Sequence, residues 1–246
     1  MRLAGGEAIV ETKLRILAVG AHPDDIEILC AGTLAKYARA GHEVYIAIAT
    51  DGAAGHAELK PEELRPIRMK EAQAAAEVIG AQIRFIGEED EWLFHDRPTR
   101  EKFVEAIRWA APHVIITHNP EDYHPDHRAC SDLVFAASFL ATLPNIMPEV
   151  PAQQHMPALF YMDSLAGAGF TPEYYVDITD TYEVKIQMLS KHESQLKWLK
   201  DHDNIDIVQF VQTVARRRGV ECGVQYAEAF RAARVWPRIH PQRLLP

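Results

Sequence analysis

The feature that most restricts the fold of this chain is a regular alternation of strand-like and helix-like patterns. Short apolar runs at 14–20, 43–50 and 113–118 have the length and β-branched content of buried strands. Helix-like stretches follow them, and Pro61 and Pro125 stand where the first turn of a helix is expected. Strict alternation is typical of a mostly parallel sheet covered by helices on both faces, so we expect an α/β fold.

The pattern also gives approximate bounds. We expect strands at 14–20, 43–50, 83–86, 113–118, 159–162 and 174–177. We expect helices at 27–39, 61–79, 99–111, 125–143, 180–199, 205–217 and 224–233, and an irregular tail from Pro237. No composition shift divides the chain. We therefore predict a single domain over 1–246, with a core at about 14–143 and an appended part at about 144–246.

Composition and charge exclude several classes of protein. The formal net charge of −9 argues against a nucleic-acid or anionic-membrane partner, because such proteins usually present a basic face. No apolar run approaches the roughly 18 residues of a membrane span, and residues 1–13 lack the apolar segment of a signal peptide. The three cysteines form neither a disulfide pattern nor a zinc-knuckle pattern, which fits a reducing cytoplasm.

A dense group of ionisable residues follows the first strand. Residues 21–25 read Ala-His-Pro-Asp-Asp, so one imidazole and two carboxylates lie within four positions. Ligand-binding crevices in open α/β sheets form at this carboxyl end of the strands. Burying such a loop costs desolvation energy unless a positive partner neutralises it, and a divalent metal is the simplest candidate.

A second group, His124-Pro125-Asp126-His127, follows the fourth strand in the same way. If the strand order is the common 3-2-1-4, the first and fourth strands are neighbours and the order reverses between them. The two loops then flank the topological switch point, where α/β folds place active sites. The pair of loops is therefore more informative than either loop alone.

Together the loops suggest a catalytic metal site. His22 and Asp25 can reach one ion from a tight turn, and a distant histidine would complete a three-ligand set with an open position, as in catalytic zinc sites. Iron or manganese could replace zinc, because imidazole and carboxylate serve several ions. Asp24 could act as a general base, and the histidine not on the metal could stabilise an oxyanion, with Asp126 fixing its tautomer.

These residues resemble the LmbE/PIG-L family of zinc-dependent de-N-acetylases. The hallmarks of that family are an AHPDD loop after the first strand and an HPDH loop after the fourth, here at 21–25 and 124–127. Supporting similarities extend the resemblance over about 14–233. They lie at 32–35, 50–52, 67–72 and 191–195.

The resemblance implies a Rossmann-like, LmbE-like fold and a set of roles. Zinc would be held by His22, Asp25 and His127, and Asp24 would be the general base. The imidazole of His124 would stabilise the oxyanion and act as acid, supported by Asp126. Arg68 would line the pocket and meet substrate hydroxyls, oriented by Glu71. Relatives in this family are often homo-oligomers, including hexamers.

Several positions have alternative interpretations. Tyr123 stands where family members often carry glycine, and its phenol would narrow the pocket or add a hydrogen-bond donor. Arg68 could instead form a surface ion pair, and Asp51 could belong to an Asp-Gly turn rather than contact substrate. We expect His192 and Gln195 to be solvated on a polar helix face.

The main hypothesis is hydrolysis of an N-acetyl group on a small amino sugar or amino-sugar conjugate. A hydratase or other lyase on the same fold and a non-catalytic metal-binding relative are the alternatives. The intact Asp24 favours hydrolysis over hydration, and the intact Asp24 and His124 argue against a purely structural metal site, because such a site requires neither. We expect substrate specificity to reside in the loops at 52–61, 87–98 and 144–157.

Overall fold

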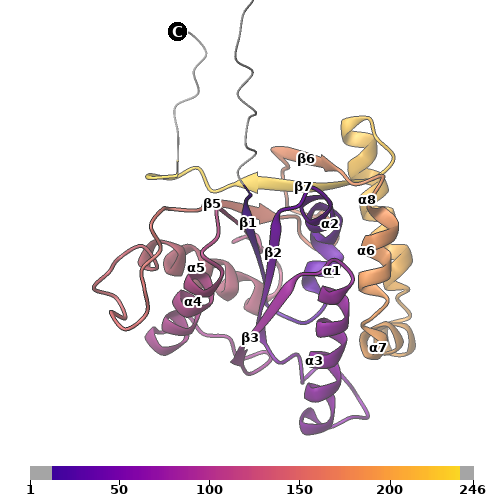
Figure 1. Ribbon diagram of the computed structural model, residues 1–246. Coiled ribbons are helices and arrows are strands. Elements are labelled where there is room, and N and C mark those ends of the chain that lie inside the picture. The colour runs from indigo at the N-terminus through magenta and orange to yellow at the C-terminus, as the bar shows by residue number, and fades with distance from the viewer. Residues whose placement is uncertain (1–12, 239–246) are drawn as a thin grey trace, which may run out of the picture.

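A seven-stranded sheet forms the centre of the computed structural model, which describes residues 13–238 (Figure 1). The strand order is β3-β2-β1-β4-β5-β7-β6. The strands are β1 (Arg15–Gly20), β2 (Glu43–Thr50), β3 (Gln82–Glu88), β4 (Val114–Thr117), β5 (Ala158–Met162), β6 (Tyr174–Asp177) and β7 (Ala227–Ala232). The predicted order 3-2-1-4 is confirmed. The expectations for a leader in residues 1–13 and for the end of the tail fall largely outside the described residues.

The first five strands are parallel, which brings their carboxyl ends to one edge of the sheet. In the shared register Val19 pairs with Ala47 on one side and with Thr117 on the other. The loops after β1 and β4 therefore start level with each other. Strand β7 runs antiparallel between β5 and β6 and extends the sheet.

Helices cover both faces of the sheet, as predicted (Figure 1). The helices α4 and α5 pack on one face, and α1, α2 and α3 lie on the other, with α6 packed against them. Their bounds are α1 (Asp25–Leu29), α2 (Ala31–Arg39), α3 (Pro61–Glu77), α4 (Arg97–Ala110), α5 (Pro125–Leu140), α6 (Tyr182–Leu189), α7 (Glu193–Asp203) and α8 (Ile207–Cys222). Two apolar clusters, one on each side, bury the strand residues, as expected for parallel strands.

Four helix predictions were wrong in detail, and one of them is the helix expected at 205–217, which begins at Ile207 and continues to Cys222 as α8. The expected helix at 27–39 is broken at Cys30, whose φ of −145° is not helical. Helix α4 begins two residues before Thr99, because Asp96 rather than Thr99 is the N-cap and accepts the Thr99 N–H at 2.9 Å. The expected helix at 180–199 is two helices separated at 190–192.

The expected helix at 224–233 is the strand β7, and this is the largest error. The sequence of β7 is rich in alanine and reads as helical from propensity alone. In the structure its backbone pairs with β5 on one side and with β6 on the other. Sheet pairing on both edges, with four consecutive residues buried, outweighs the local preference.

A buried ion pair connects β7 to the break between α1 and α2. The Glu228 carboxylate accepts the N–H groups of Gly32 and Thr33 at 2.9 and 2.7 Å. These N–H groups lie in the first turn of α2, where a helix offers them no acceptor of its own. Lys185 of α6 completes the group, with its Nζ 2.6 Å from Glu228 Oε1. The late part of the chain thus fixes the helices that follow the first loop.

Within residues 13–238, none of the helices has the length and apolar character needed to cross a membrane.

Candidate metal centre and active site

The loop after β1 folds back on itself and presents its ionisable side chains together. The His22 N–H donates to Asp25 Oδ2 at 2.7 Å, and the Ala21 carbonyl accepts from the Thr50 N–H and hydroxyl at 2.8 and 2.9 Å. Asp24 adopts φ = 114°, a left-handed conformation that is rare for a residue with a side chain. The turn places Asp25 at the first position of α1 and leaves Asp24 beside it.

The second loop leads directly into α5, with His124 as its N-cap residue. The Asp122 carboxylate accepts the His124 N–H at 3.0 Å and also lies 3.0 Å from His127 Nδ1. A carboxylate on one ring nitrogen of a histidine leaves the other nitrogen for a ligand, the arrangement common around metal-binding histidines. Asp122 therefore orients His127 from the opposite side of the ring.

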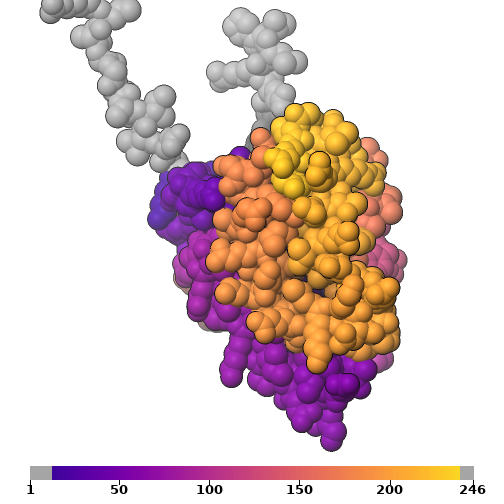
Figure 2. Space-filling model, turned by 90° about the vertical axis from the view of Figure 1, so that its right-hand side faces the viewer, coloured from indigo at the N-terminus to yellow at the C-terminus, as the bar shows by residue number. Residues whose placement is uncertain are grey.

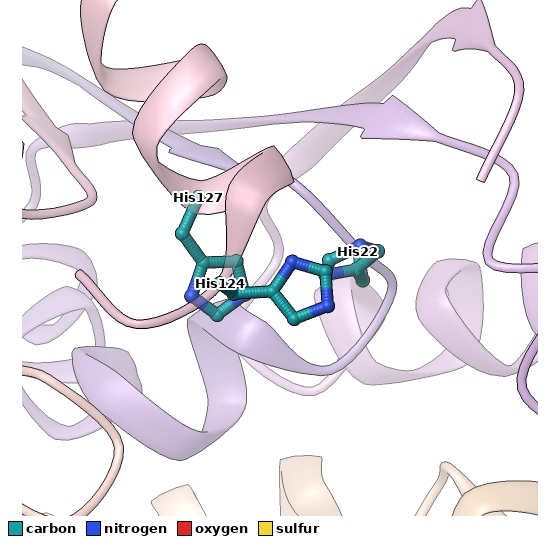
Figure 3. A group of neighbouring side chains, drawn as sticks. All are labelled: His22, His124 and His127. Carbon is teal, nitrogen blue, oxygen red and sulfur yellow. The ribbon is translucent and has the colours of Figure 1, made fainter. Parts of the chain in front are cut away.

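The two loops meet, as the strand order requires. Asp25 Oδ1 lies 3.2 Å from His127 Nε2, and Asp25 Oδ2 lies 3.4 Å from His22 Nδ1. Figure 3 shows His22 from the first loop facing His124 and His127 from the start of α5. The ring centroids of His22 and His127 are 5.2 Å apart. Residues about one hundred positions apart in the sequence thus form one cluster.

This cluster has the donor set of a metal centre. The nitrogens of His22, His124 and His127 lie within 4.8 Å of one another, and so do ligand atoms of Asp25, His118 and His127. The buried His22 Nε2 makes no well-aligned hydrogen bond within the described residues, although carboxylate oxygens of Asp90 and Asp126 lie 3.3 and 3.4 Å away. An imidazole nitrogen placed in this way among carboxylates fits a ligand of a cation. Imidazole and carboxylate donors suit zinc, and also iron or manganese.

Charge coupling within the cluster is strong. Burial raises the pKa of Asp25, but the imidazoles of His127, His118 and His22 outweigh burial and hold that pKa well below its usual range. Burial lowers the pKa of His127, but Asp25 and Asp122 more than compensate and raise it to about 9. Asp25 is thus held as an anion, the form that binds a cation.

Asp24 is the second acid of the loop and is not part of the histidine cluster. Burial raises its pKa to about 6, although Arg68 acts in the opposite direction. Its Oδ2 lies 3.0 Å from Arg68 Nη2. A partly buried carboxylate with a pKa near neutrality has the character of a general base.

Arg68 is a buried residue that lines the cavity, not a surface ion-pair partner; the residue is 4% exposed. Its guanidinium donates to the Gly52 carbonyl at 2.8 Å and to the Pro23 carbonyl. A Cβ on Gly52 would lie 2.5 Å from Arg68 Nη1, so glycine makes this approach possible. The expectation that Glu71 orients Arg68 was wrong, because Glu71 accepts from the Ser194 N–H and hydroxyl instead.

Asp126 contacts His124 differently from the expected way. Its main-chain N–H, rather than its carboxylate, lies 3.2 Å from His124 Nδ1. The carboxylate accepts the N–H groups of Glu91 and Leu93 at 2.9 and 3.3 Å and lies 3.4 Å from His22 Nε2. Asp126 therefore fixes the loop after β3 against the cluster.

Tyr123 and Asp51 lie in different surroundings. Tyr123 lines the cavity and is 64% exposed. Burial, Asp25 and Asp122 raise the pKa of its phenol to about 12, so it stays a donor. Asp51 is outside the cavity lining; its carboxylate pairs with Arg65 at 2.6 Å and accepts the N–H groups of Ala53 and Asp90.

The expectation that His192 and Gln195 are solvated was wrong. His192 is fully buried, with its Nε2 3.3 Å from Glu27 Oε2, and Gln195 donates to the Gly55 carbonyl at 3.0 Å. Gln195 lines the cavity, so the start of α7 forms one of its walls. The polar pattern of this helix could not predict that the two side chains are buried, because their partners come from distant parts of the chain.

Three further residues of the site had no predicted role. The buried His118 accepts the Ala21 N–H on Nε2 at 2.9 Å and contacts Asp25, so it supports the first loop. Asp122 and the buried Asp90 are the others, and Asp90 Oδ1 lies 3.3 Å from His22 Nε2. Their positions after the carboxyl ends of β4 and β3 could have predicted a place in the site, because these ends lie at one edge of a parallel sheet.

A cavity of about 250 Å³ opens over the cluster. Of the three loops expected to govern specificity, 52–61 contributes Gly55 and 87–98 contributes Asp90 and Glu91, but 144–157 does not reach the cavity. Apolar side chains from the late part of the chain complete the wall, namely Leu165, Leu199, Ile205, Ile207 and Phe210.

The fold and the cluster define an α/β protein with a candidate His/Asp metal centre at the switch point of its sheet. A family model described as "PIG-L: GlcNAc-PI de-N-acetylase" matches residues 17–138, which include both loops. Together with the relatives below, this match shows that the chain belongs to the PIG-L (LmbE-like) family.

Proteins similar to this chain include deacetylases and a hydratase. The diacetylchitobiose deacetylase of Thermococcus kodakarensis is 31% identical, covering 88% of this chain and 82% of that one. The structure of N,N'-diacetylchitobiose deacetylase from Pyrococcus horikoshii aligns with a TM-score of 0.78 at 28% identity over 88% and 82% of the chains. The 4-oxalmesaconate hydratase of Pseudomonas putida is 23% identical over 91% and 90%.

Proposed function

We propose that this protein is a metal-dependent hydrolase that removes an N-acetyl group from an amino sugar or an amino-sugar conjugate. The observation that supports this most directly is the convergence of Asp25, His22 and His127, with Asp24 beside them. The deacetylase relatives support the substrate class, since they match over more than four-fifths of the chain.

The residues proposed to hold the metal are His22, Asp25 and His127, and zinc is the proposed ion, with Fe²⁺ or Mn²⁺ as substitutes. His118 is a poorer ligand, because its Nε2 already accepts the Ala21 N–H. A bound metal of this kind polarises a carbonyl oxygen and lowers the pKa of water toward neutrality.

The protein residues supply the proton transfers. Asp24 accepts the proton of the water that attacks the acetyl carbonyl, and Arg68 holds the Asp24 carboxylate in place. His124 faces the same cavity and stabilises the oxyanion that forms. It then donates a proton to the nitrogen as the C–N bond breaks, which leaves acetate and a free amine.

The remaining assignments are also proposals. Arg68 and Tyr123 line the cavity and can meet substrate hydroxyls. Asp51 would act on substrate only indirectly, through the Asp90 N–H. Asp126 supports the site by fixing the loop at 91–93. We propose one catalytic domain over 1–246, because early and late strands share one sheet. A homo-oligomer, with a hexamer as one form, and a cytoplasmic location stay predictions.

An acetate-release assay tests the proposal. We expect the zinc-loaded protein to release acetate from N-acetylglucosamine or N,N'-diacetylchitobiose, to lose this activity with a chelator and to regain it with zinc. An unsaturated dicarboxylic acid tests the hydratase alternative in parallel. Hydration of that acid without acetate release from any acetylated sugar would overturn the deacetylase proposal.

A further inference from the structure

Glu91 is the exposed carboxylate among the described residues that line the cavity. Its side chain is 51% exposed, whereas those of Asp24, Asp25 and Asp90, which also line the cavity, are at most 13% exposed. The main-chain N–H of Glu91 donates to Asp126 Oδ2 at 2.9 Å, which fixes the residue in place. The carboxylate of Glu91 therefore lies at the mouth of the cavity, between the buried acids and the solvent.

The backbone of Glu91 has a conformation that is unusual for a residue with a side chain. Its φ is 67°, in the left-handed region that glycine adopts readily. Non-glycine residues in such conformations cluster at active sites and at segments that bind ligands. The chain keeps a carboxylate here against the preference of the backbone, which points to a function for the carboxylate itself.

The buried carboxylates of the lining already have partners. Asp24 Oδ2 lies 3.0 Å from Arg68 Nη2, and the Asp90 carboxylate accepts the Ala54 N–H at 2.8 Å. Asp25 contacts the histidines of the cluster and is a proposed metal ligand. Each of these carboxylates is therefore engaged within the site itself.

Glu91 differs from these acids, because no lysine or arginine pairs with it in the described part of the chain. Its Oε1 lies 3.4 Å from His124 Nε2, so the carboxylate is close to the proposed reaction centre. Of the described residues that line the cavity, four carry carboxylates and one, Arg68, carries a guanidinium. A divalent ion at the proposed metal centre would leave one negative charge in excess, and the exposed carboxylate of Glu91 carries it.

The rest of the lining offers an anionic ligand little compensation. The wall from the late part of the chain, whose outer surface Figure 2 shows, is apolar apart from the Gln195 amide. The two terminal nitrogens of Arg68 already donate to Asp24 and to the carbonyls of Gly52 and Pro23, which leaves its buried Nε without a partner. A carboxylate or phosphate at the mouth would therefore meet Glu91 before it met a free cationic side chain.

We propose that Glu91 selects substrates by charge. It admits N-acetylated amino sugars that are neutral or positively charged, and Coulomb repulsion disfavours those that carry a carboxylate or a phosphate on the same ring. This inference rests on the proposed deacetylase function and narrows its substrate class. The same charge disfavours an unsaturated dicarboxylic acid, the substrate class of the hydratase alternative.

Three sugars of nearly equal size isolate the effect of charge. The neutral parent is whichever sugar of the acetate-release assay reacts faster, and an ammonium or a carboxylate replaces one primary hydroxyl in the other two. For the wild type we expect kcat/KM to fall from the cation to the neutral sugar to the anion, with about tenfold between the last two. Glu91→Gln keeps the size of the side chain and removes its charge, so the three values should approach one another.

Glu89→Gln is the matched control, because Glu89 is an exposed residue of the same loop that does not line the cavity. This variant should keep the wild-type order of the three sugars. Added salt should reduce the difference between cation and anion in the wild type and in Glu89→Gln but not in Glu91→Gln, because salt screens exposed charges.

The outcomes separate this inference from the proposed function. An equal loss of kcat/KM on all three sugars in Glu91→Gln, or an unchanged ratio of anion to neutral sugar, would overturn charge selection and leave the deacetylase proposal standing. A wild type that releases acetate from neither parent sugar would overturn both.

Discussion

At the scale of single residues, Asp24 is the residue whose substitution should, on the proposed mechanism, impair catalysis without impairing metal binding. It lies beside Asp25 but pairs with Arg68, so its carboxylate is free of the histidine cluster. We expect Asp24→Asn to lower kcat by about 10²–10⁴-fold, the usual contribution of a general base. Zinc content, measured by elemental analysis, should stay near that of the wild type. Retained turnover, or loss of zinc, would show that Asp24 has another role.

Asp122 provides a second prediction at this scale. Its carboxylate lies 3.0 Å from His127 Nδ1, on the side of the ring away from Asp25. Removing such a supporting carboxylate typically costs 10–100-fold in metal affinity or activity. We expect Asp122→Asn to weaken zinc binding by that range in a competition titration with a chelator. The neighbouring Glu121→Gln, whose side chain is exposed, should leave zinc affinity unchanged.

The sequence predicted those site residues that stand in compact motifs. His22, Asp24, Asp25, His124 and His127 lie in two short loops, and parallel-strand topology brings such loops together. His192 and Gln195 could not be found this way. Their partners lie in the segments of Glu27 and Gly55, so only the tertiary arrangement of α7 shows that they are buried.

At the scale of elements, the buried group around Glu228 joins β7, α2 and α6. Lys185 Nζ is 2.6 Å from the Glu228 carboxylate, and both side chains are almost fully buried. Removing one partner of a buried pair costs about 3–5 kcal/mol, because the other charge stays buried without compensation. We expect Glu228→Gln to lower the free energy of unfolding by about 3 kcal/mol in urea denaturation.

The control for this prediction is Glu183→Gln, which changes an exposed carboxylate on the same helix as Lys185. Its free energy of unfolding should change by no more than about 0.5 kcal/mol. Equal stability of both variants would contradict the view that Glu228 anchors the start of α2.

Periodicity was a good guide to the first elements and a poor one to the last. The runs 14–20 and 43–50 are long, apolar and β-branched, and both are strands within a residue of their predicted ends. The segment 224–233 is rich in alanine and has Val224 as its single β-branched residue. It is a strand because β5 and β6 offer it two partners, and no local pattern reports a partner that arrives from elsewhere in the chain.

At the scale of the whole molecule, the proposed metal centre would join two parts of the core sheet. One proposed ligand loop follows β1 and the other leads into α5, so a bound ion would tie together segments about one hundred residues apart. A ligand that binds only the folded state stabilises it by about 2.7 kcal/mol at one hundred times its Kd. We expect zinc to raise the Tm of the chelator-treated protein by several degrees.

The matched variants make this prediction specific. Asp24→Asn should keep the zinc-dependent rise in Tm, whereas His22→Ala should lose it, because only the second removes a proposed ligand. A rise of equal size in His22→Ala would place the ion elsewhere in the molecule.

The backbone of Asp24, with its φ of 114°, has a cost that the fold carries in every copy of the protein. Residues with side chains lose about 1–3 kcal/mol in such conformations, and glycine does not. An inactive Asp24→Gly protein should therefore unfold at a higher temperature than an inactive Asp24→Ala protein, a difference that calorimetry can measure. Selection for turnover would then have kept an aspartate at this position, at the expense of a higher thermal stability that glycine would allow.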